Sequence, residues 1–309
     1  MGRVRVRGGA ARPGARRPGT AAGAAPVLLE ERQVAARPGH AGRRRTRVLG
    51  AQRVPPLRRS LARAAVLVSG SAAGWHVATV VAARPLTPTA RGLTLAVPGL
   101  PAPLPGQHVD LRLTAPDGYT ATRSYSLAAS GQAERVDLVV DRVPGGEVSP
   151  YLVEEARPGD VMEVRGPLGG FFVWHEDDPG PVLLVAGGSG VVPLLAMLRA
   201  RRASSSVAPF LVVVSVRTPD DAIARAEIDE PTVGVEVRWV FTRRTPPDWP
   251  AGPHRLAADD LVAPGFAPED HPAVFVCGPT GFVEHAAGLL TTIGHAPGRV
   301  RTERFGGTS

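Results

Sequence analysis

The hydrophobic pattern of this chain changes once, at Pro179-Gly180-Pro181, and that change limits the possible folds more than any other feature. Before it, short apolar or alternating runs are separated by Pro, Gly and Asp turns, which is typical of a small antiparallel barrel. After it, continuous apolar runs alternate with helical stretches, which indicates a parallel sheet covered on both faces. The sequence therefore predicts two domains, a six-stranded antiparallel barrel at 71–178 and a parallel-sheet α/β domain at 179–309.

The expected elements follow from the same pattern. The barrel strands are expected at residues 76–82, 92–97, 107–113, 122–128, 136–143 and 161–164. One helix, at 148–156, is expected to interrupt them and to end before Pro158-Gly159. The strands of the α/β domain are expected at 182–186, 210–216, 235–241, 273–277 and 299–304. Its helices are expected at 191–202, 222–228, 257–261 and 280–293.

Residues 1–70 differ in composition from the rest. They hold sixteen arginines and two acidic residues, a net charge of +14, whereas 71–309 hold twenty arginines and 26 acidic residues, a net charge of −6. A block of like charge, rich in Gly, Pro and Ala, cannot bury enough apolar surface to offset its ordering entropy, so we predict that 1–70 is disordered. We interpret it as a non-functional extension. The alternatives are an Arg-rich targeting peptide and a nucleic-acid arm, the latter disfavoured by the lack of interleaved aromatics.

The rest of the composition excludes several classes of protein. Cys277 is the single cysteine, so the chain has no internal disulfide, thiolate zinc site or Cys-ligated iron–sulfur cluster. The eight histidines lack a tight ligand spacing, so no metal site is expected. No run approaches the roughly 20 apolar residues of a membrane span, and the lone thiol is compatible with a reducing cytoplasm. We expect a cytoplasmic monomer that binds no nucleic acid.

A glycine-rich turn at 187–193 (GGSGVVP) follows a predicted buried strand and opens a predicted helix, the context in which such a turn binds a dinucleotide phosphate. Pro193 replaces the usual last glycine, and proline is tolerated in a first helical turn. The next strand ends at Arg217 rather than at a carboxylate, which favours NADP over NAD. Arg243, after the following strand, offers a second cation. Either arginine is equally compatible with a solvated strand end.

Four segments stand at the ends of predicted strands: 123–126 (RSYS), 187–193, 277–279 (CGP) and 302–306 (TERFG). Together, and in this order, they resemble the ferredoxin–NADP reductase family, in which a flavin-binding barrel is fused to a nicotinamide-binding α/β domain. The resemblance runs from about Trp75 to Gly306. It is closest to the single-component reductases without an iron–sulfur domain.

The resemblance implies an FAD site on the barrel. Arg123 would contact the pyrophosphate, Tyr125 would stack on the isoalloxazine and Ser126 would lie near its N5 atom. In the segment 144–149, the residues that would complete the pyrophosphate site are Gly146, Val148 and Ser149. From the letters alone, 123–126 fits an ordinary edge strand, and Ser149 fits a residue in the first turn of a helix.

The resemblance also implies a nicotinamide site on the α/β domain. It assigns cofactor binding to Gly187, Gly188, Gly190, Pro193, Cys277, Gly278 and Pro279. Cys277 would border the nicotinamide C4, and Glu303 would lie near the contact between flavin and nicotinamide. Phe305 would lie against the flavin, and whether it shields the ring is open because Gly306-Gly307-Thr308-Ser309 follow it. Ala224 stands where the family often has a bulkier residue, which puts adenine stacking there in doubt.

The implied function is that of a flavin-dependent NAD(P)H oxidoreductase. Hydride would pass from NAD(P)H, with NADPH favoured, to FAD, and single electrons would then leave for a separate acceptor such as ferredoxin or an oxygenase component. Ser126, Cys277 and Glu303 are the predicted catalytic residues. Two alternatives remain: a flavin-free NAD(P)-dependent dehydrogenase, and a non-catalytic sensor that binds flavin or nucleotide.

Overall fold

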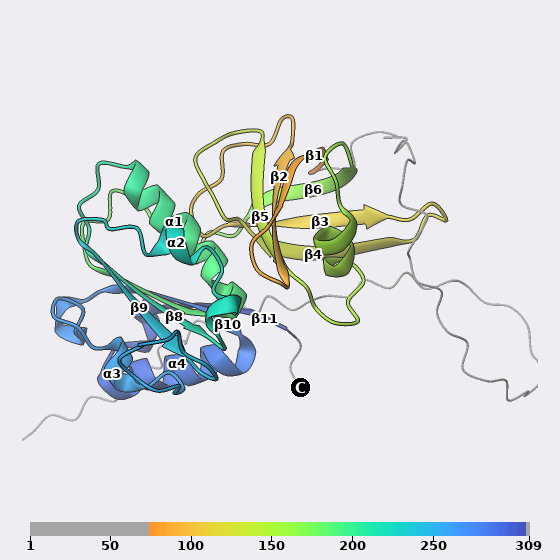
Figure 1. Ribbon diagram of the computed structural model, residues 1–309. Coiled ribbons are helices and arrows are strands. Elements are labelled where there is room, and N and C mark those ends of the chain that lie inside the picture. Colours follow the sequence, from red (N-terminus) through yellow and green to blue (C-terminus); the bar gives the residue numbers. More distant parts are fainter. Residues whose placement is uncertain (1–73, 307–309) are drawn as a thin grey trace, which may run out of the picture.

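The computed structural model describes residues 74–306, and the predicted extension at 1–70 lies outside them. Two sheets stand side by side (Figure 1), one of six strands and one of five. The first is antiparallel and the second is parallel. The predicted succession of an antiparallel barrel and a parallel-sheet domain is therefore confirmed.

The six-stranded sheet forms the barrel. Its strands are β1 (Trp75–Pro85), β2 (Ala90–Ala96), β3 (His108–Thr114), β4 (Thr120–Ser126), β5 (Arg135–Asp141) and β6 (Val161–Leu168), in the order β4-β3-β6-β1-β2-β5. A bridge between Leu127 and Leu138 joins the two edge strands, β4 and β5. Alternate residues such as Leu93, Leu95 and Leu111 are buried inside, as the two-residue period of a strand requires.

The five-stranded sheet has helices on both faces. Its strands are β7 (Val182–Gly187), β8 (Phe210–Val216), β9 (Val235–Phe241), β10 (Ala273–Pro279) and β11 (Val300–Phe305), in the order β11-β10-β7-β8-β9. The helices are α1 (Val191–Ala203), α2 (Arg225–Ile228), α3 (Ala258–Leu261) and α4 (Thr280–Ile293). The α1 and α2 helices pack on the face toward the barrel, and α3 and α4 pack on the opposite face (Figure 1). This double cover explains why β7 and β8 are buried along their whole length.

Two predicted helices differ from those in the structure. At the place of the helix expected at 148–156, residues 149–150 are helical and continue into a five-residue π-helix, η1 (Tyr151–Glu155). A helix is therefore present there, but its last turn is wider, since the Ala156 amide donates to the Tyr151 carbonyl (2.9 Å). At its start, Ser149 accepts a hydrogen bond from the Val143 amide (3.1 Å), and Val148 is buried in the barrel core. The helix expected at 222–228 shortens to α2, because Ala224 before it has a left-handed backbone conformation (φ 53°).

Four 3₁₀ turns complete the described elements. They are η2 (Gly188–Gly190), η3 (Pro219–Asp221), η4 (Pro268–Asp270) and η5 (Pro297–Arg299). Three of them begin with proline, whose fixed φ suits the first position of a helical turn. The η2 turn begins with glycine and joins β7 directly to α1.

Candidate functional site

The strand order of the parallel sheet marks a crevice between β7 and β10. From β7 the chain proceeds to β8 and β9 on one side and then crosses to β10 and β11 on the other. In open α/β sheets, ligands bind outside the carboxyl ends of the strands at this switch point. The predicted glycine-rich turn and the segment Cys277-Gly278-Pro279 both lie there, at the ends of β7 and β10.

Close packing explains three of the glycines at the crevice. A Cβ on Gly190 would lie 2.2 Å from the Cys277 carbonyl oxygen. A Cβ on Gly187 or Gly278 would lie 2.6 or 2.8 Å from the ring of Phe282, on α4. These glycines therefore let the two strand ends and α4 approach one another. Phe282 was missed by the sequence reasoning, although its position three residues after Pro279 gave a signal.

Gly188 differs from those three glycines. Its φ is +55°, and nothing lies within 4 Å of where its Cβ would be. The turn is thus open at Gly188, and a ligand can approach its main chain there. Pro193 lies in the first turn of α1 and is buried, so its contribution is to shape the start of the helix.

Glu303 on β11 and Cys277 on β10 are neighbours in the register of the sheet. The Glu303 side chain is 7% exposed, its Oε2 has no hydrogen-bond partner, and burial raises its pKa to about 7. Cys277 is buried in the core, and burial, with the nearby Glu303 charge, raises the pKa of its thiol well above the usual value. At neutral pH the thiol is protonated, so Cys277 is not an activated nucleophile.

His108 extends this pair to the barrel, and the sequence reasoning missed it. Its Nδ1 lies 3.9 Å from Oε1 of Glu303, and in the β3–β4 register His108 is opposite Ser126. Burial lowers the His108 pKa, so the ring is neutral at pH 7, and this contact is not an ion pair there. Ser126, His108, Glu303 and Cys277 therefore form a continuous series across the two domains. The signal for His108 was a polar residue at the start of a strand, two residues after the Pro105-Gly106 turn.

The segment Arg123-Ser124-Tyr125-Ser126 lies on β4 as predicted. Tyr125 packs against the barrel core cluster, whereas Ser124 faces the other way and donates to Asp110 (2.6 Å). Arg123 reaches the 143–149 loop, where its Nη2 lies 3.3 Å from Oε2 of Glu147. The structure therefore brings Arg123 and the predicted Gly146-Glu147-Val148-Ser149 segment together.

In that loop the side chain of Val148 is buried in the core, so only its main chain is placed to meet a ligand. Ser149 is also buried and holds the Val143 amide. A Cβ on Gly146 would lie 3.2 Å from the Val143 carbonyl, while Gly145 (φ +77°) has nothing within 4 Å of that position. The loop is closed by its own contacts at Gly146 and open at Gly145.

The two predicted nucleotide cations lie together at the carboxyl ends of β8 and β9. Arg217 and Arg243 follow β8 and β9, both side chains are exposed, and the Arg243 amide donates to the Arg217 carbonyl (2.9 Å). Arg244 is paired with Asp220. Two exposed cations at this position suit an anionic ligand group.

Aromatic rings near these cations come from β9 and the loop after it, not from the position of Ala224. The guanidinium of Arg225 lies 5.7 Å from the Trp239 ring centroid and 5.6 Å from those of Phe241 and Trp249. Arg225 is therefore held by cation–π contacts.

Phe305, at the end of β11, is half-buried against the core on the barrel side of the parallel sheet, beside Pro279 in the strand register.

Within residues 74–306, no group of three or more His, Cys, Asp or Glu side chains is arranged to hold a metal ion. Over the same range, no helix is both long enough and apolar enough to cross a bilayer.

Two family models match the chain. The model of the oxidoreductase FAD-binding domain matches residues 80–173, and the model of the oxidoreductase NAD-binding domain matches residues 184–288. The first match begins within β1 and runs past the end of β6, and the second begins in β7 and ends within α4.

Individual relatives agree with these models. Ferredoxin–NADP reductase B of Sorangium cellulosum is 35% identical over 210 residues, which are 65% of this chain and 85% of that protein. The glycine betaine monooxygenase reductase subunit of Pseudomonas aeruginosa is 30% identical, and the match covers 66% of this chain but 56% of that subunit. Among solved structures, the ferredoxin reductase in carbazole 1,9a-dioxygenase matches with a TM-score of 0.64 and 27% identity, over 75% of this chain and 69% of that one.

Proposed function

The chain belongs to the ferredoxin–NADP reductase family of FAD-dependent NAD(P)H oxidoreductases, and we propose that NADPH is its preferred donor and a separate ferredoxin or oxygenase component its acceptor. The observation that carries the proposal is the series Ser126–His108–Glu303–Cys277, which joins the flavin motif of the barrel to the crevice between β7 and β10.

The residues present fit FAD and a nicotinamide nucleotide. Five side-chain polar atoms of the described residues are buried without a hydrogen-bond partner, and three of them are Asp141 Oδ1, Glu303 Oε2 and Arg304 Nε. Asp141 ends β5 just before the 143–149 loop, and the other two lie at the end of β11. Buried polar atoms normally have partners, so these three suit a polar ligand. The open positions at Gly145 and Gly188 leave room for one.

In this proposal Arg123 and the main chain of 145–149 hold the FAD pyrophosphate, Tyr125 supports the flavin ring and Ser126 lies at its N5 edge. The turn at Gly187, Gly188 and Gly190, with Pro193, holds the nucleotide pyrophosphate, while Cys277, Gly278 and Pro279 border the nicotinamide. Phe305 lies against the flavin. When bound, FAD supplies the chemistry that accepts a hydride from nicotinamide C4 and releases electrons one at a time.

The contribution of the protein is alignment, exclusion of water and electrostatics. Cys277 and Glu303 are almost fully buried, so this end of the crevice is dry. Because burial raises the Glu303 pKa to about 7, its carboxyl can hold or release a proton near neutral pH. None of these residues has to act as a strong base.

The preference for NADPH rests on Arg217 and Arg243. Their exposed guanidinium groups follow adjacent strands, where an arginine can contact the 2′-phosphate that distinguishes NADP from NAD. The Arg244–Asp220 pair neutralises a third cation close by, so we assign the 2′-phosphate to Arg217 and Arg243 alone.

The test is the visible spectrum of the purified protein supplied with FAD, followed by anaerobic addition of NADPH or NADH. We expect flavin bands that bleach with both donors and faster with NADPH. Reoxidation should then need a one-electron acceptor, such as a [2Fe–2S] ferredoxin, to be fast. A protein that stays colourless with FAD while it oxidises a substrate with NADP is the flavin-free dehydrogenase. One that binds FAD but is not bleached is the sensor.

A further inference from the structure

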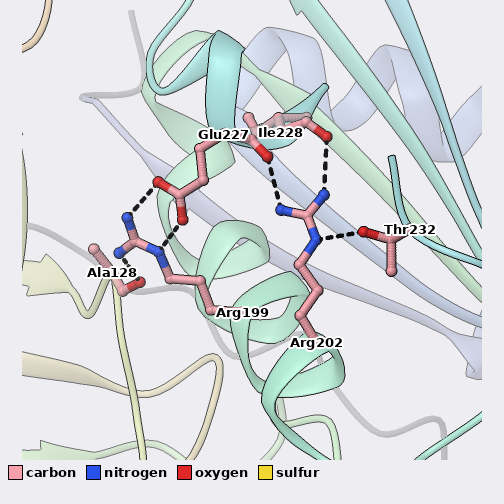
Figure 2. A network of polar contacts seen from close by, with 6 residues as sticks. All are labelled: Ala128, Arg199, Arg202, Glu227, Ile228 and Thr232. Atoms are coloured by element: carbon pink, nitrogen blue, oxygen red, sulfur yellow. Dashed lines mark hydrogen bonds and ion pairs between the residues drawn. The ribbon is translucent and has the colours of Figure 1, made fainter. Parts of the chain in front are cut away.

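Arg199 on α1 contacts two other segments of the chain (Figure 2). Its Nε and Nη2 donate to the two carboxylate oxygens of Glu227, on α2, at 2.5 and 2.7 Å. Its Nη1 donates to the main-chain carbonyl of Ala128, in the barrel, at 2.8 Å. Ala128 lies two residues after Ser126, and α1 begins at the glycine-rich turn. One guanidinium therefore joins α1, which begins at the glycine-rich turn, to the segment directly after β4, the strand of the flavin motif.

We propose that Arg199 is a positioning residue, which fixes the α/β domain against the flavin-binding strand and so sets the relative placement of nicotinamide and flavin. The proposal rests on the proposed function. Arg199 itself lies outside the residues that would contact either cofactor, and it acts through Ala128 and α1.

The contact needs the geometry of arginine. A guanidinium offers five N–H donors in a rigid plane, so it can bind a carboxylate with two of them and a carbonyl with a third. Glu227 remains charged because its hydrogen bond to Arg199, above all, holds the pKa of its carboxyl below the ordinary value. A lysine offers a point charge and cannot make the same three bonds in fixed directions.

The packing around Arg199 is open, which increases the importance of the polar contact. A cavity of about 90 Å³ lies between the barrel strands β1, β2 and β5 and the α/β domain, and its lining includes Leu195, Arg199 and Ala128. Apolar side chains of the barrel, among them Leu86, Ala90 and Val139, also pack on the core of the α/β domain. At the cavity this packing is incomplete, and there the directional bonds of Arg199 add to it.

Arg202 provides a matched control on the same helix. It donates to Thr232 Oγ1 (2.8 Å) and to the carbonyls of Glu227 (2.7 Å) and Ile228 (3.2 Å), as Figure 2 shows, and also to that of Glu230 (2.8 Å). All of these partners belong to the α/β domain. Arg202 thus anchors α1 to the segment around α2, as Arg199 does. Unlike Arg199, it makes none of its described hydrogen bonds to a barrel residue.

The experiment compares Arg199→Ala with Arg202→Ala in the FAD-loaded protein. The first readout is amide hydrogen exchange over residues 128–134, and the second is the single-turnover rate of flavin bleaching by NADPH. We expect Arg199→Ala to speed the exchange and to slow the bleaching by about 10- to 100-fold, the scale of a misplacement near 1 Å, with FAD retained. Arg202→Ala should leave both readouts within about twofold of the wild type.

Equal rates of flavin bleaching in Arg199→Ala and Arg202→Ala would overturn the proposal. So would amide hydrogen exchange at 128–134 that Arg199→Ala leaves unchanged. If Arg199→Ala does not fold, Arg199→Lys and Glu227→Gln are tested in its place. We expect both to speed the amide exchange and to slow the bleaching, each by less than in Arg199→Ala. A wild type that FAD loads but NADPH does not bleach refutes the proposed function instead. The exchange readout still decides in that case whether Arg199 holds the barrel segment.

Discussion

At the scale of single residues, Glu303 has the least ordinary environment in the site. Most carboxylates in proteins are exposed or paired, but Glu303 is buried, and one of its oxygens has no partner. Its nearest cationic candidate, His108, is neutral at pH 7 because burial lowers the His108 pKa. Glu303 is therefore protonated in part of the population at neutral pH, which an exposed glutamate is not.

The pH dependence of stability tests this state of Glu303. Burial raises its pKa from 4.5 to about 7, so the folded state binds the proton more tightly than the unfolded chain. The cost of ionising it in the folded state grows as the pH rises from about 4.5 to 7 and reaches about 3 kcal/mol above that. Glu303→Gln should thus match the wild type in free energy of unfolding near pH 4 and exceed it by about that amount near pH 8. Urea denaturation of both proteins over this pH range measures the two free energies of unfolding. A difference between them that does not change with pH would contradict the prediction.

Arg217 determines the choice of donor in our proposal. Arg217→Ala should raise the KM for NADPH about tenfold, because a charged contact to the 2′-phosphate is lost, and should change the KM for NADH by less than about twofold. Steady-state kinetics with both donors measures this. Arg157→Ala, an exposed arginine on the barrel, is the control. Equal changes for the two donors would remove Arg217 from the 2′-phosphate site.

At the scale of elements, the site depends on how closely the end of β7 approaches the end of β10. Gly190 packs on the Cys277 carbonyl, and Gly187 and Gly278 pack on Phe282. The glycine-rich turn therefore has two functions that the sequence pattern combines: it holds the strand ends together, and at Gly188 it leaves the main chain open to a ligand.

Two alanine substitutions separate these functions. Gly190→Ala should lower the free energy of unfolding by about 3 kcal/mol, because the new Cβ overlaps a main-chain carbonyl that cannot move alone. Gly188→Ala should cost about 1 to 2 kcal/mol, because it meets no atom and only strains the left-handed backbone. Chemical denaturation of both variants measures the difference. Equal costs would show that the close approach at Gly190 is not constraining.

The sequence predicted those elements best whose pattern is determined locally. The strands at 210–216 and 235–241 coincide with β8 and β9, because each is an apolar or β-branched run bounded by turn residues. The helix expected at 148–156 is present at 149–155, but most of it is a π-helix, with Val148 buried before it and the Ser149–Val143 bond at its start. Propensity alone does not report such tertiary contacts.

The residues of the candidate site also fall into those that the sequence could place and those that it could not. Residues at strand ends, such as Cys277 and Glu303, could be placed from the sequence, because parallel strands end at one edge of a sheet. His108 and Arg199 could not, because their roles depend on how the barrel and the α/β domain dock. The assigned cofactor contacts of the site residues remain predictions, as do the domain boundaries at 71–178 and 179–309.

At the scale of the whole molecule, the chain divides into a cationic segment and an acidic remainder. Residues 71–309 carry a net charge of −6, so an acidic ferredoxin would have to approach a local cationic surface rather than a cationic domain. The strands described here all lie within residues 75–305, and so do the core residues that cover both sheets.

Removal of residues 1–70 should therefore leave the enzyme intact. We expect the shortened chain to keep its FAD, its rate of bleaching by NADPH and its Tm within about 2 °C of the full chain, because it keeps every core residue of the described range 74–306. Absorbance and thermal denaturation compare the two chains. Loss of FAD on truncation would contradict the interpretation of 1–70 as non-functional. Salt-sensitive binding of nucleic acid by the full chain alone would support the nucleic-acid arm instead.

The central claim is that hydride crosses from nicotinamide to FAD at the crevice between β7 and β10, on the side of the barrel residues Ser126 and His108. The most direct measurement is the anaerobic single-turnover bleaching of bound FAD by NADPH that carries deuterium at the transferred C4 position. We predict that the flavin bleaches in one turnover and that deuterium slows the step, because a C–H bond breaks in it. Bound FAD that NADPH and NADH leave oxidised would contradict the claim.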